Sequence, residues 1–255
     1  MSISACIICY NEEELLPGTL KYLESLSNLD EISIIDSFSN DNTWSIICDF
    51  SRKTKKKFVF KQQKFESFGK QKNDCMEMAT GHWILLIDAD ETYGYQLNRL
   101  LGDLKKDDPT NLNNINAIRI RTFQTFIDKY HYSNPDWLDP HIRIWRKHLF
   151  KYHGDCHERL QDAQGRDMHT CYDKDVLTLH DTEEYKQIYM LHHQQLKSSE
   201  ALLHKGERWQ QLGMLEKSAE QDLPFKVTSW ADQKRDSPRT CQSHEIPKEF
   251  WDYET

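Results

Sequence analysis

Glycine is scarce in this sequence, and the two common glycine-rich phosphate-binding motifs are missing. The chain has 9 glycines among 255 residues, and they form neither Gly-x-Gly-x-x-Gly nor Gly-x-x-x-x-Gly-Lys. Those motifs let backbone N–H groups approach a diphosphate closely. The usual dinucleotide and P-loop cradles are therefore excluded, and a nucleotide, if bound, must be held by carboxylates and a metal ion.

Long apolar runs are also missing. No run approaches the roughly 20 residues that a membrane-spanning helix needs, and no apolar stretch typical of a secretion signal follows Met1. The 7 cysteines form an odd set, which favours reduced thiols and a cytoplasmic protein, either soluble or peripheral to the cytoplasmic face of a membrane. A net charge of −8 argues against nucleic acid as a partner.

The most distinctive stretch is an apolar run that is followed directly by acidic residues. Residues 83–87 (WILLI) are followed directly by Asp88, Ala89, Asp90 and Glu91. The run is too short for a helix and predicts a buried central strand, and open α/β sheets bind ligands just beyond the carboxyl ends of such strands. Clustered carboxylates repel one another unless a cation joins them, and hard oxygen ligands suit Mg²⁺ or Mn²⁺. An acidic turn that caps a helix is the plainer alternative.

Strand and helix patterns alternate over the first part of the chain. Apolar, β-branched runs predict strands at 3–9, 31–36 and 58–60, and helical spacing predicts helices from Asn11 as N-cap, at 44–50 and at 65–79. Cys6 and Cys9 fall inside the first strand pattern and are interpreted as small core residues. The alternation predicts an α/β fold with a mostly parallel sheet, which places Asp36 at the same edge as the acidic stretch.

Two later segments, 117–126 and 142–145, alternate apolar and polar residues as half-buried strands do. The loop between them contains Tyr130, Tyr132 and Trp137. Aromatic rings pack on the apolar faces of sugars, so this loop is a candidate wall of an acceptor site. The rings could equally anchor the loop on the core.

Apolar residues at helical spacing predict a long helix over 183–212. This helix would pack against the catalytic domain or against a partner subunit in a homo-oligomer. Peripheral membrane association is a weaker alternative, because the polar face carries both charge signs. Residues 222–255 are polar and contain several prolines, which predicts an extended tail that wraps the domain or stays disordered.

Four segments, in this order and at this spacing, resemble the inverting GT-A glycosyltransferases of family two. They are 7–12 (IICYNE), 34–43 (IIDSFSNDNT), 71–73 (QKN) and 79–91 (ATGHWILLIDADE). Two later segments, 140–147 (PHIRIWRK) and 157–160 (HERL), are most similar to the bacterial lipopolysaccharide-core β-glycosyltransferases. The resemblance covers roughly residues 1–212. It departs at Phe38 and Asn42, where the family often has glycine.

The resemblance implies a Rossmann-like GT-A domain, with a mostly parallel sheet flanked by helices, that moves a sugar from a nucleoside-diphosphate sugar to an acceptor. A UDP-sugar is the expected donor, a hydroxyl of a glycan or glycoconjugate is the expected acceptor, and Mn²⁺ or Mg²⁺ is the expected cofactor. The residues implied for the donor are Tyr10 and Glu12 along the base and ribose, Asp36 on the base, Lys70 and Asn73 beside the nucleotide, and Asp88 near the ribose. Asp90 and His180 would bind the metal, and Trp137 and Arg143 are candidates for the acceptor side.

Inverting transfer needs a base that takes the proton of the attacking hydroxyl, and a carboxylate is a common choice. Glu158 is the candidate, since it matches the family's His-Glu motif, and Asp155 is the reserve. Without the resemblance, an ion pair of Glu158 with Arg159 or Arg143 would be the better interpretation.

These assignments divide the chain into a catalytic domain (1–182, with a nucleotide-sugar half at 1–92 and an acceptor half at 93–182), a helix (183–213) and a tail (214–255). Two other functions are considered. The acidic stretch also resembles the nucleophile loop of haloacid-dehalogenase-type phosphatases, but the later acidic segment at 102–108 follows too closely to leave room for the intervening strands. A non-catalytic nucleotide-sugar or glycan-binding module on the same fold is the other, and it would not depend on Glu158.

Overall fold

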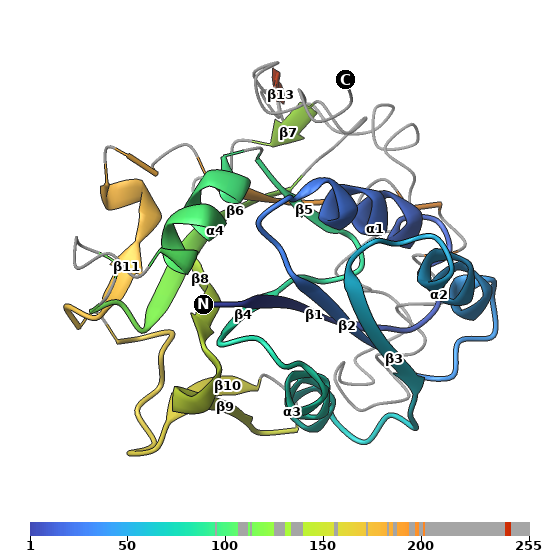
Figure 1. Ribbon diagram of the computed structural model, residues 1–255, viewed down its shortest axis with the longest axis horizontal. Helices are drawn as coiled ribbons and strands as arrows, with labels where there is room; N and C mark the ends of the chain where they lie inside the picture. The colour runs from blue at the N-terminus through green and yellow to red at the C-terminus, as the bar shows by residue number, and fades with distance from the viewer. Residues whose placement is uncertain are drawn as a thin grey trace, which may run out of the picture.

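The computed structural model describes residues 1–94, 96–106, 112, 114–124, 131–133, 140–155, 158–171, 173–182, 184–185, 188–193, 197–198, 201 and 243–245. Within these residues the chain forms one large mixed sheet with helices on both faces (Figure 1). No helix in this part of the chain is long and apolar enough to span a membrane.

The main sheet has the strand order β3-β2-β1-β4-β8-β6-β12-β5, and β11 pairs with β6 as well. Its strands are β1 (Ile3–Cys9), β2 (Glu31–Asp36), β3 (Lys57–Gln62), β4 (Trp83–Leu86), β5 (Glu91–Tyr93), β6 (Ala117–Gln124), β8 (His141–Arg146), β11 (Val176–Thr178) and β12 (Tyr189–His192). The first four strands are parallel, and β8 and β5 run antiparallel to their neighbours. The predicted α/β fold with a mostly parallel sheet is confirmed.

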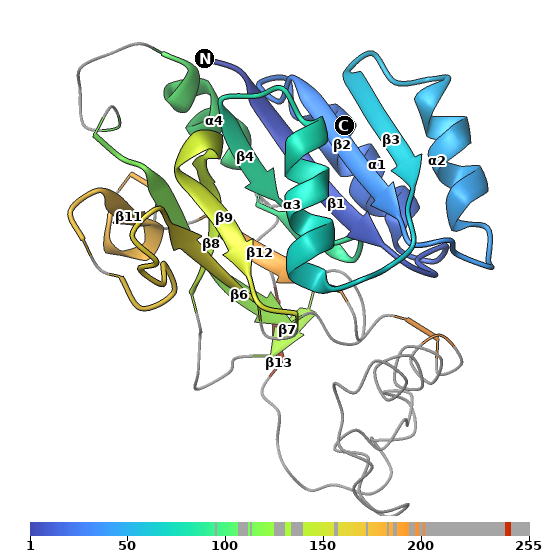
Figure 2. The ribbon, with the colours of Figure 1, turned by 90° about the horizontal axis from the view of Figure 1, so that it is seen from below.

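The helices and a small hairpin cover the two faces of this sheet. The helices are α1 (Leu16–Ser25), α2 (Thr43–Ser51), α3 (Phe68–Met78) and α4 (Leu97–Lys105), with 3₁₀ turns η1 (Lys147–Leu149) and η2 (Leu179–Asp181). β9 (Phe150–His153) and β10 (Arg159–Asp162) form the hairpin, and β7 (His131–Ser133) pairs with β13 (Ser243–Glu245). α1, α2 and α4 contribute to one buried core, and α3 and the hairpin contribute to the other (Figure 2).

Cys6 and Cys9 lie in these two cores and not beside each other. Their spacing is Cys-x-x-Cys, which elsewhere can indicate a redox or metal pair. Successive side chains of a strand point to opposite faces, so Cys6 packs in the core under α3 and Cys9 in the core under α1. Both are buried free thiols, as the strand pattern predicted.

The strand register explains why acidic residues meet at one edge. Cys9 pairs with Asp36 across β1 and β2, and Cys6 pairs with Leu86 across β1 and β4. Because these strands are parallel, Asp36 and the acidic stretch after β4 emerge at the same carboxyl edge. β6 and β12 run in the same direction as β4, so His192 at the end of β12 reaches that edge too.

Two predictions about local structure are wrong. Asn11 does not cap α1, because the helix begins at Leu16 with Leu15 as its N-cap, and Asn11 has a positive φ of 53°. The segment predicted as a long helix from residue 183 contains the strand β12 instead. Its residues Met190 and Leu191 are buried in this chain's own fold. Residues 202–212 of that helix lie outside the described residues, as does the tail after 222 apart from β13.

Gly69 in α3 is required where the helix meets the loop before β10. A Cβ at this position would lie 2.4 Å from the carbonyl oxygen of Gly154 and 3.4 Å from Cβ of Glu158. We expect Gly69→Ala to lower the free energy of unfolding by about 1–3 kcal/mol through overpacking, measured by urea denaturation. Gly18→Ala in α1 is the control, since no atom lies within 4 Å of its Cβ, and it should stabilise by about 0.5–1 kcal/mol. Equal effects of the two changes would contradict the steric argument.

Candidate active site

The loops after β1 and β2 are joined by hydrogen bonds at the carboxyl edge. The Asn11 N–H donates to Ser39 Oγ at 2.9 Å, and the Asn40 N–H donates to Asn11 Oδ1 at 3.0 Å. The Glu12 N–H donates to Thr43 Oγ1 at 2.7 Å. These bonds fix the backbone at Glu12, so its carboxylate is held at the edge of the sheet.

Phe38 occupies the middle of this arrangement with a φ of 57° and is 55% exposed. Glycine adopts this left-handed conformation at little cost, whereas a bulky residue is strained there. A glycine, which the resemblance leads us to expect at this position, would adopt this φ without strain. Asn42 has a φ of −77°, so its backbone makes no such demand.

The acidic stretch after β4 is held in place from α1 and β8. The Thr19 hydroxyl donates to the carbonyl oxygens of Ala89 and Glu91, at 2.8 and 3.1 Å. The Asp88 N–H donates to Glu91 Oε2 at 2.9 Å. Arg143, whose side chain is 11% exposed, lies 2.9 Å from Glu91 Oε1 and 3.7 Å from Asp88 Oδ2. Arg143 therefore neutralises part of the acid and orients two of its carboxylates.

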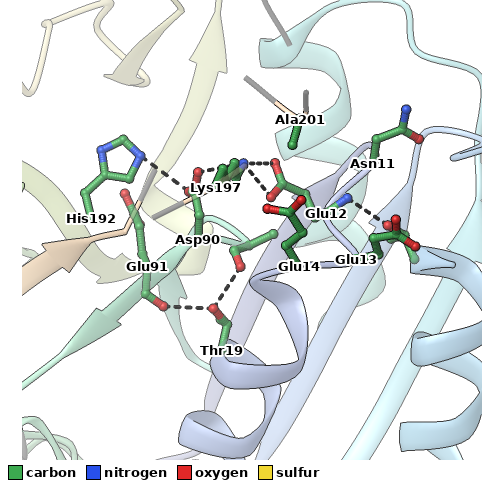
Figure 3. Close-up of polar contacts among 12 residues, drawn as sticks. Asn11, Glu12, Glu13, Glu14, Thr19, Asp90, Glu91, His192, Lys197 and Ala201 are labelled. Atoms are coloured by element: carbon green, nitrogen blue, oxygen red, sulfur yellow. Dashed lines mark hydrogen bonds and ion pairs between the residues drawn. The ribbon is translucent and has the colours of Figure 1, made fainter. Parts of the chain in front are cut away.

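Asp90 lies between a histidine and a lysine from the later part of the chain (Figure 3). His192 Nε2 is 3.4 Å from Asp90 Oδ1, and Lys197 Nζ is 3.0 Å from Asp90 Oδ2. Lys197 also lies 2.6 Å from Glu12 Oε2. Burial by itself would lower the pKa of Lys197, but Asp90 and Glu12 outweigh it and raise that pKa above its ordinary value. Lys197 thus stays charged between the two carboxylates.

The donor set at Asp90 fits a divalent metal. Asp90 Oδ1 and His192 Nε2 are close enough to bind one ion together, given ligand distances of about 2.0–2.2 Å. No group of three or more His, Cys, Asp and Glu side chains in the described part of the chain could hold a metal by itself. Mg²⁺ commonly uses one or two protein ligands together with substrate phosphates and water. Asp90 and His192 would therefore hold the ion jointly with a diphosphate.

A second group of charges lies where α3 meets the hairpin. Lys72 forms an ion pair with Glu158, and their side chains are 12% and 14% exposed. The Lys72 ammonium also lies 5.1 Å from the centre of the Tyr152 ring. Burial by itself would lower the pKa of Lys72, but its neighbours, which include the Asp88 and Glu158 carboxylates, raise it above its ordinary value. Lys72 therefore stays charged, paired with Glu158 and stabilised by the charge of Asp88.

The pKa values of Asp88 and its neighbour Glu91 are shifted in opposite directions. Burial acts to raise the pKa of Asp88, but the charges of Arg143 and Lys72 hold it below its ordinary value. Burial raises the pKa of Glu91 to about 7, against the effect of Arg143 and with a contribution from Asp88. Asp88 thus stays ionised at neutral pH, whereas Glu91 exchanges a proton there.

Glu91 is expected to make the protein less stable as the pH rises from about 4.5 to 7. Its carboxyl has a pKa of 4.5 when exposed and about 7 in the fold. The folded chain therefore binds more protons than the unfolded chain in this window, and the free energy of unfolding falls, by up to about 3 kcal/mol. Above about pH 7 the contribution is constant. Glu91→Gln should remove this decline in urea denaturation, and parallel pH profiles of the two proteins would contradict the assignment.

Three residues predicted to contact the nucleotide are engaged within the protein. Asp36 is fully buried and accepts hydrogen bonds from Ser39 and, at 2.9 Å, from Gln62 Nε2. The Asn73 amide donates to the Tyr152 carbonyl oxygen at 2.8 Å and accepts from the Tyr152 N–H at 2.9 Å. Lys70 forms an ion pair with Asp74 on the same helix. The nucleotide contacts of these three residues stay predictions. In this structure Asp36 bonds to the loop after β2, Asn73 bonds to the β9–β10 hairpin, and Lys70 pairs within α3.

The remaining predicted residues are placed as follows. Tyr10 is half-buried directly after β1, and Asp155 is exposed in the loop before β10. His180 lies in η2, and its side chain, like the whole of Trp137, lies outside the described residues. The partners suggested for Glu158 were wrong, because Arg143 pairs with Glu91 and Arg159 pairs with Asp167.

Sequence reasoning missed Lys72, His192 and Lys197. Lys72 lies in the 71–73 segment of the resemblance, which was the signal for it, although no role was assigned to it there. His192 ends a four-residue strand, which resembles the pattern that pointed to His180. No signal in the sequence identified Lys197, because its partners Glu12 and Asp90 are both more than a hundred residues away along the chain.

Residues 4–158 match the sequence model of Glycosyl transferase family 2, which is more than half of the chain. The chain belongs to glycosyl transferase family 2. The resemblance found in the sequence is thus confirmed, and in this family 2 glycosyltransferase His192 and Lys197 lie beyond the matched region.

Two curated relatives match parts of this family 2 glycosyltransferase. The glycosyltransferase SunS, derived from the SPbeta prophage of Bacillus subtilis, is 35% identical over 94 residues, which is 36% of this chain and 21% of SunS. The lipopolysaccharide core biosynthesis glycosyltransferase LpsC of Rhizobium meliloti is 34% identical over 104 residues, which is 41% of this chain and 37% of LpsC. The matches therefore span about a fifth of SunS and just over a third of LpsC.

Among solved structures, TarS residues 1–349 from S. aureus resembles the chain with a TM-score of 0.49 and 14% identity. The likeness covers 87% of this chain and 67% of the TarS chain.

Proposed function

We propose that this family 2 glycosyltransferase moves a sugar from a nucleoside-diphosphate sugar to an acceptor hydroxyl on a glycan or glycoconjugate, with inversion. A UDP-sugar is the donor that we favour, and Mn²⁺ or Mg²⁺ is the cofactor. The observation that carries the proposal is the meeting of Glu12, Asp90 and His192 at the carboxyl edge of the sheet. Family membership supports it independently.

The metal held by Asp90 and His192 would offset the charge that grows on the leaving diphosphate. Arg143 and Lys72 keep Asp88 ionised, so Asp88 can accept hydrogen bonds from the ribose hydroxyls. Lys72 orients the Glu158 carboxylate through their ion pair. Glu158 then takes the proton of the acceptor hydroxyl. At the same time the oxygen of that hydroxyl bonds to the anomeric carbon, and the bond between this carbon and the diphosphate breaks.

The donor side is tested by the thermal stability of the protein with UDP, GDP, ADP and CMP, each with Mn²⁺ and with EDTA. A ligand that binds only the folded chain raises its stability, by about 2.7 kcal/mol at a hundred times its dissociation constant. We expect UDP with Mn²⁺ to give the largest increase in Tm. An unchanged Tm with every nucleotide, with and without metal, would contradict the proposed function.

A further inference from the structure

Lys197 and the residue after it join the later part of the chain to the donor site. Lys197 Nζ donates to Glu12 Oε1 at 2.8 Å and lies 3.0 Å from Asp90 Oδ2, and its side chain is 3% exposed. The Ser198 N–H and hydroxyl donate to the two carboxylate oxygens of Glu14, at 2.8 and 2.5 Å. Two consecutive residues, Lys197 and Ser198, are thus fixed on the loop after β1, and Figure 3 shows Lys197 between Glu12 and Asp90.

The two oxygens of Asp90 face different partners. Oδ1 faces His192, which gives the pair that fits a divalent ion, and Oδ2 faces the Lys197 ammonium. An ion bound at the His192 side would therefore lie close to a fixed positive charge, where the Lys197 and Asp90 side chains are only 3% and 4% exposed. The ion and the ammonium, on either side of one carboxylate, would repel each other strongly because buried charges are poorly screened by solvent.

The Lys197 ammonium, which repels a metal ion, attracts a diphosphate. Its phosphates carry negative charge, and a diphosphate that shares a metal with Asp90 must come close to the ammonium that touches Asp90. Ammonium groups bind phosphate oxygens through short, charge-assisted hydrogen bonds. Lys197 Nζ lies 2.8 and 2.6 Å from the two Glu12 carboxylate oxygens and 3.0 Å from Asp90 Oδ2, so a phosphate oxygen would share its three N–H donors with these carboxylates.

We propose that Lys197 is a diphosphate-binding residue of the donor site, and that its fixed charge couples the metal to the nucleotide. The ammonium attracts the diphosphate when metal is absent and opposes the metal when the diphosphate is absent. The metal therefore binds well only together with the diphosphate, whereas the diphosphate keeps weaker binding without the metal. The inference rests on the proposed function and adds to it a residue outside the region that matches the family.

The test is calorimetry of each ligand alone, with the full chain and Lys197→Met. For UDP in EDTA, the variant is expected to bind about tenfold more weakly, as for the loss of one hydrogen bond from a charged group. For Mn²⁺ without nucleotide, the variant is expected to bind about tenfold more tightly, because the repulsion is removed. The changes in the two experiments have opposite signs.

Two control variants separate charge from structure. Lys197→Arg keeps the charge and should stay near the wild type in both titrations. Lys105→Met removes an equal charge from the ion pair with Asp30, away from the site, and should change neither titration. Weaker binding of both ligands to Lys197→Met would indicate a purely structural role and overturn the inference.

Failure of the inference differs from failure of the proposed function. If the wild type binds UDP with Mn²⁺ and Lys197→Met matches it in both titrations, only the role of Lys197 is overturned. If the wild type binds no nucleotide with or without Mn²⁺, the proposed function fails and takes the inference with it. Wild-type UDP binding that is absent in EDTA but present with Mn²⁺ would also contradict the role of Lys197.

Discussion

Glu158→Gln is expected to lower the rate of sugar transfer by roughly 10²- to 10⁴-fold, the usual effect of losing a positioned general base. Glutamine keeps the shape and reach of the side chain, but it cannot accept the proton of the acceptor hydroxyl. Donor binding should persist, since Asp90, His192 and Lys197 are unchanged. Turnover and UDP affinity, measured on the same preparation, check the two parts of this expectation.

The ion pair with Lys72 requires a control for stability. Glutamine cannot neutralise the buried ammonium, so Glu158→Gln is expected to lower Tm as well. If Glu158 were only structural, turnover would fall only in proportion to the folded fraction, and Lys72→Met would lower Tm in a similar way. Asp155→Asn, at the exposed residue of the same loop, is the matched comparison. Full activity of a folded Glu158→Gln would transfer the role of base to Asp155.

The stereochemistry is a separate outcome of the same experiment. Direct attack by the acceptor on the face opposite the diphosphate inverts the anomeric carbon. NMR of the wild-type product is expected to show the inverted configuration. Retained configuration would contradict the mechanism, whatever the activity of the variants.

Asp90→Asn is expected to abolish metal-dependent UDP binding and to lower kcat/KM by roughly 10³-fold, which corresponds to the several kcal/mol that a catalytic metal supplies. The neutral amide is a weak ligand for a hard divalent ion. It also weakens the contact with Lys197, so binding should be measured by calorimetry both with Mn²⁺ and with EDTA.

Asp103→Asn is the control for Asp90→Asn. Asp103, which lies on α4, forms an ion pair with Lys106 and accepts a hydrogen bond from the Tyr185 hydroxyl, so its loss should affect stability without changing the response to Mn²⁺. The metal assignment would be contradicted by an Asp90→Asn protein that still binds UDP more tightly with Mn²⁺ than with EDTA.

The sequence by itself determined the α/β fold and the edge at which the site lies. β1, β2 and β4 are buried parallel strands, and such strands appear in a sequence as short uninterrupted apolar runs. Asp36 at the end of β2 and Asp88 after β4 must emerge at one edge because the strands are parallel. This information is local, so it could be obtained without coordinates.

Local patterns were misleading at β12. Apolar residues around Met190 fit helical spacing, but a four-residue strand is too short to show its own period. β12 exists because it fits between β6 and β5 and pairs with both. Its partners are distant in sequence, so only the tertiary structure could show that this segment is a strand.

The tertiary structure also decided which charged side chains face each other. Thr178 pairs with Arg119 and His192 pairs with Gln124, so β11 and β12 lie beside different parts of β6. His192 consequently reaches Asp90 at the carboxyl edge. Lys197 meets Glu12 only because the chain returns to the loop after β1. Such contacts depend on strand register and on the return path of the chain, and neither is encoded in the local sequence around the residues that meet.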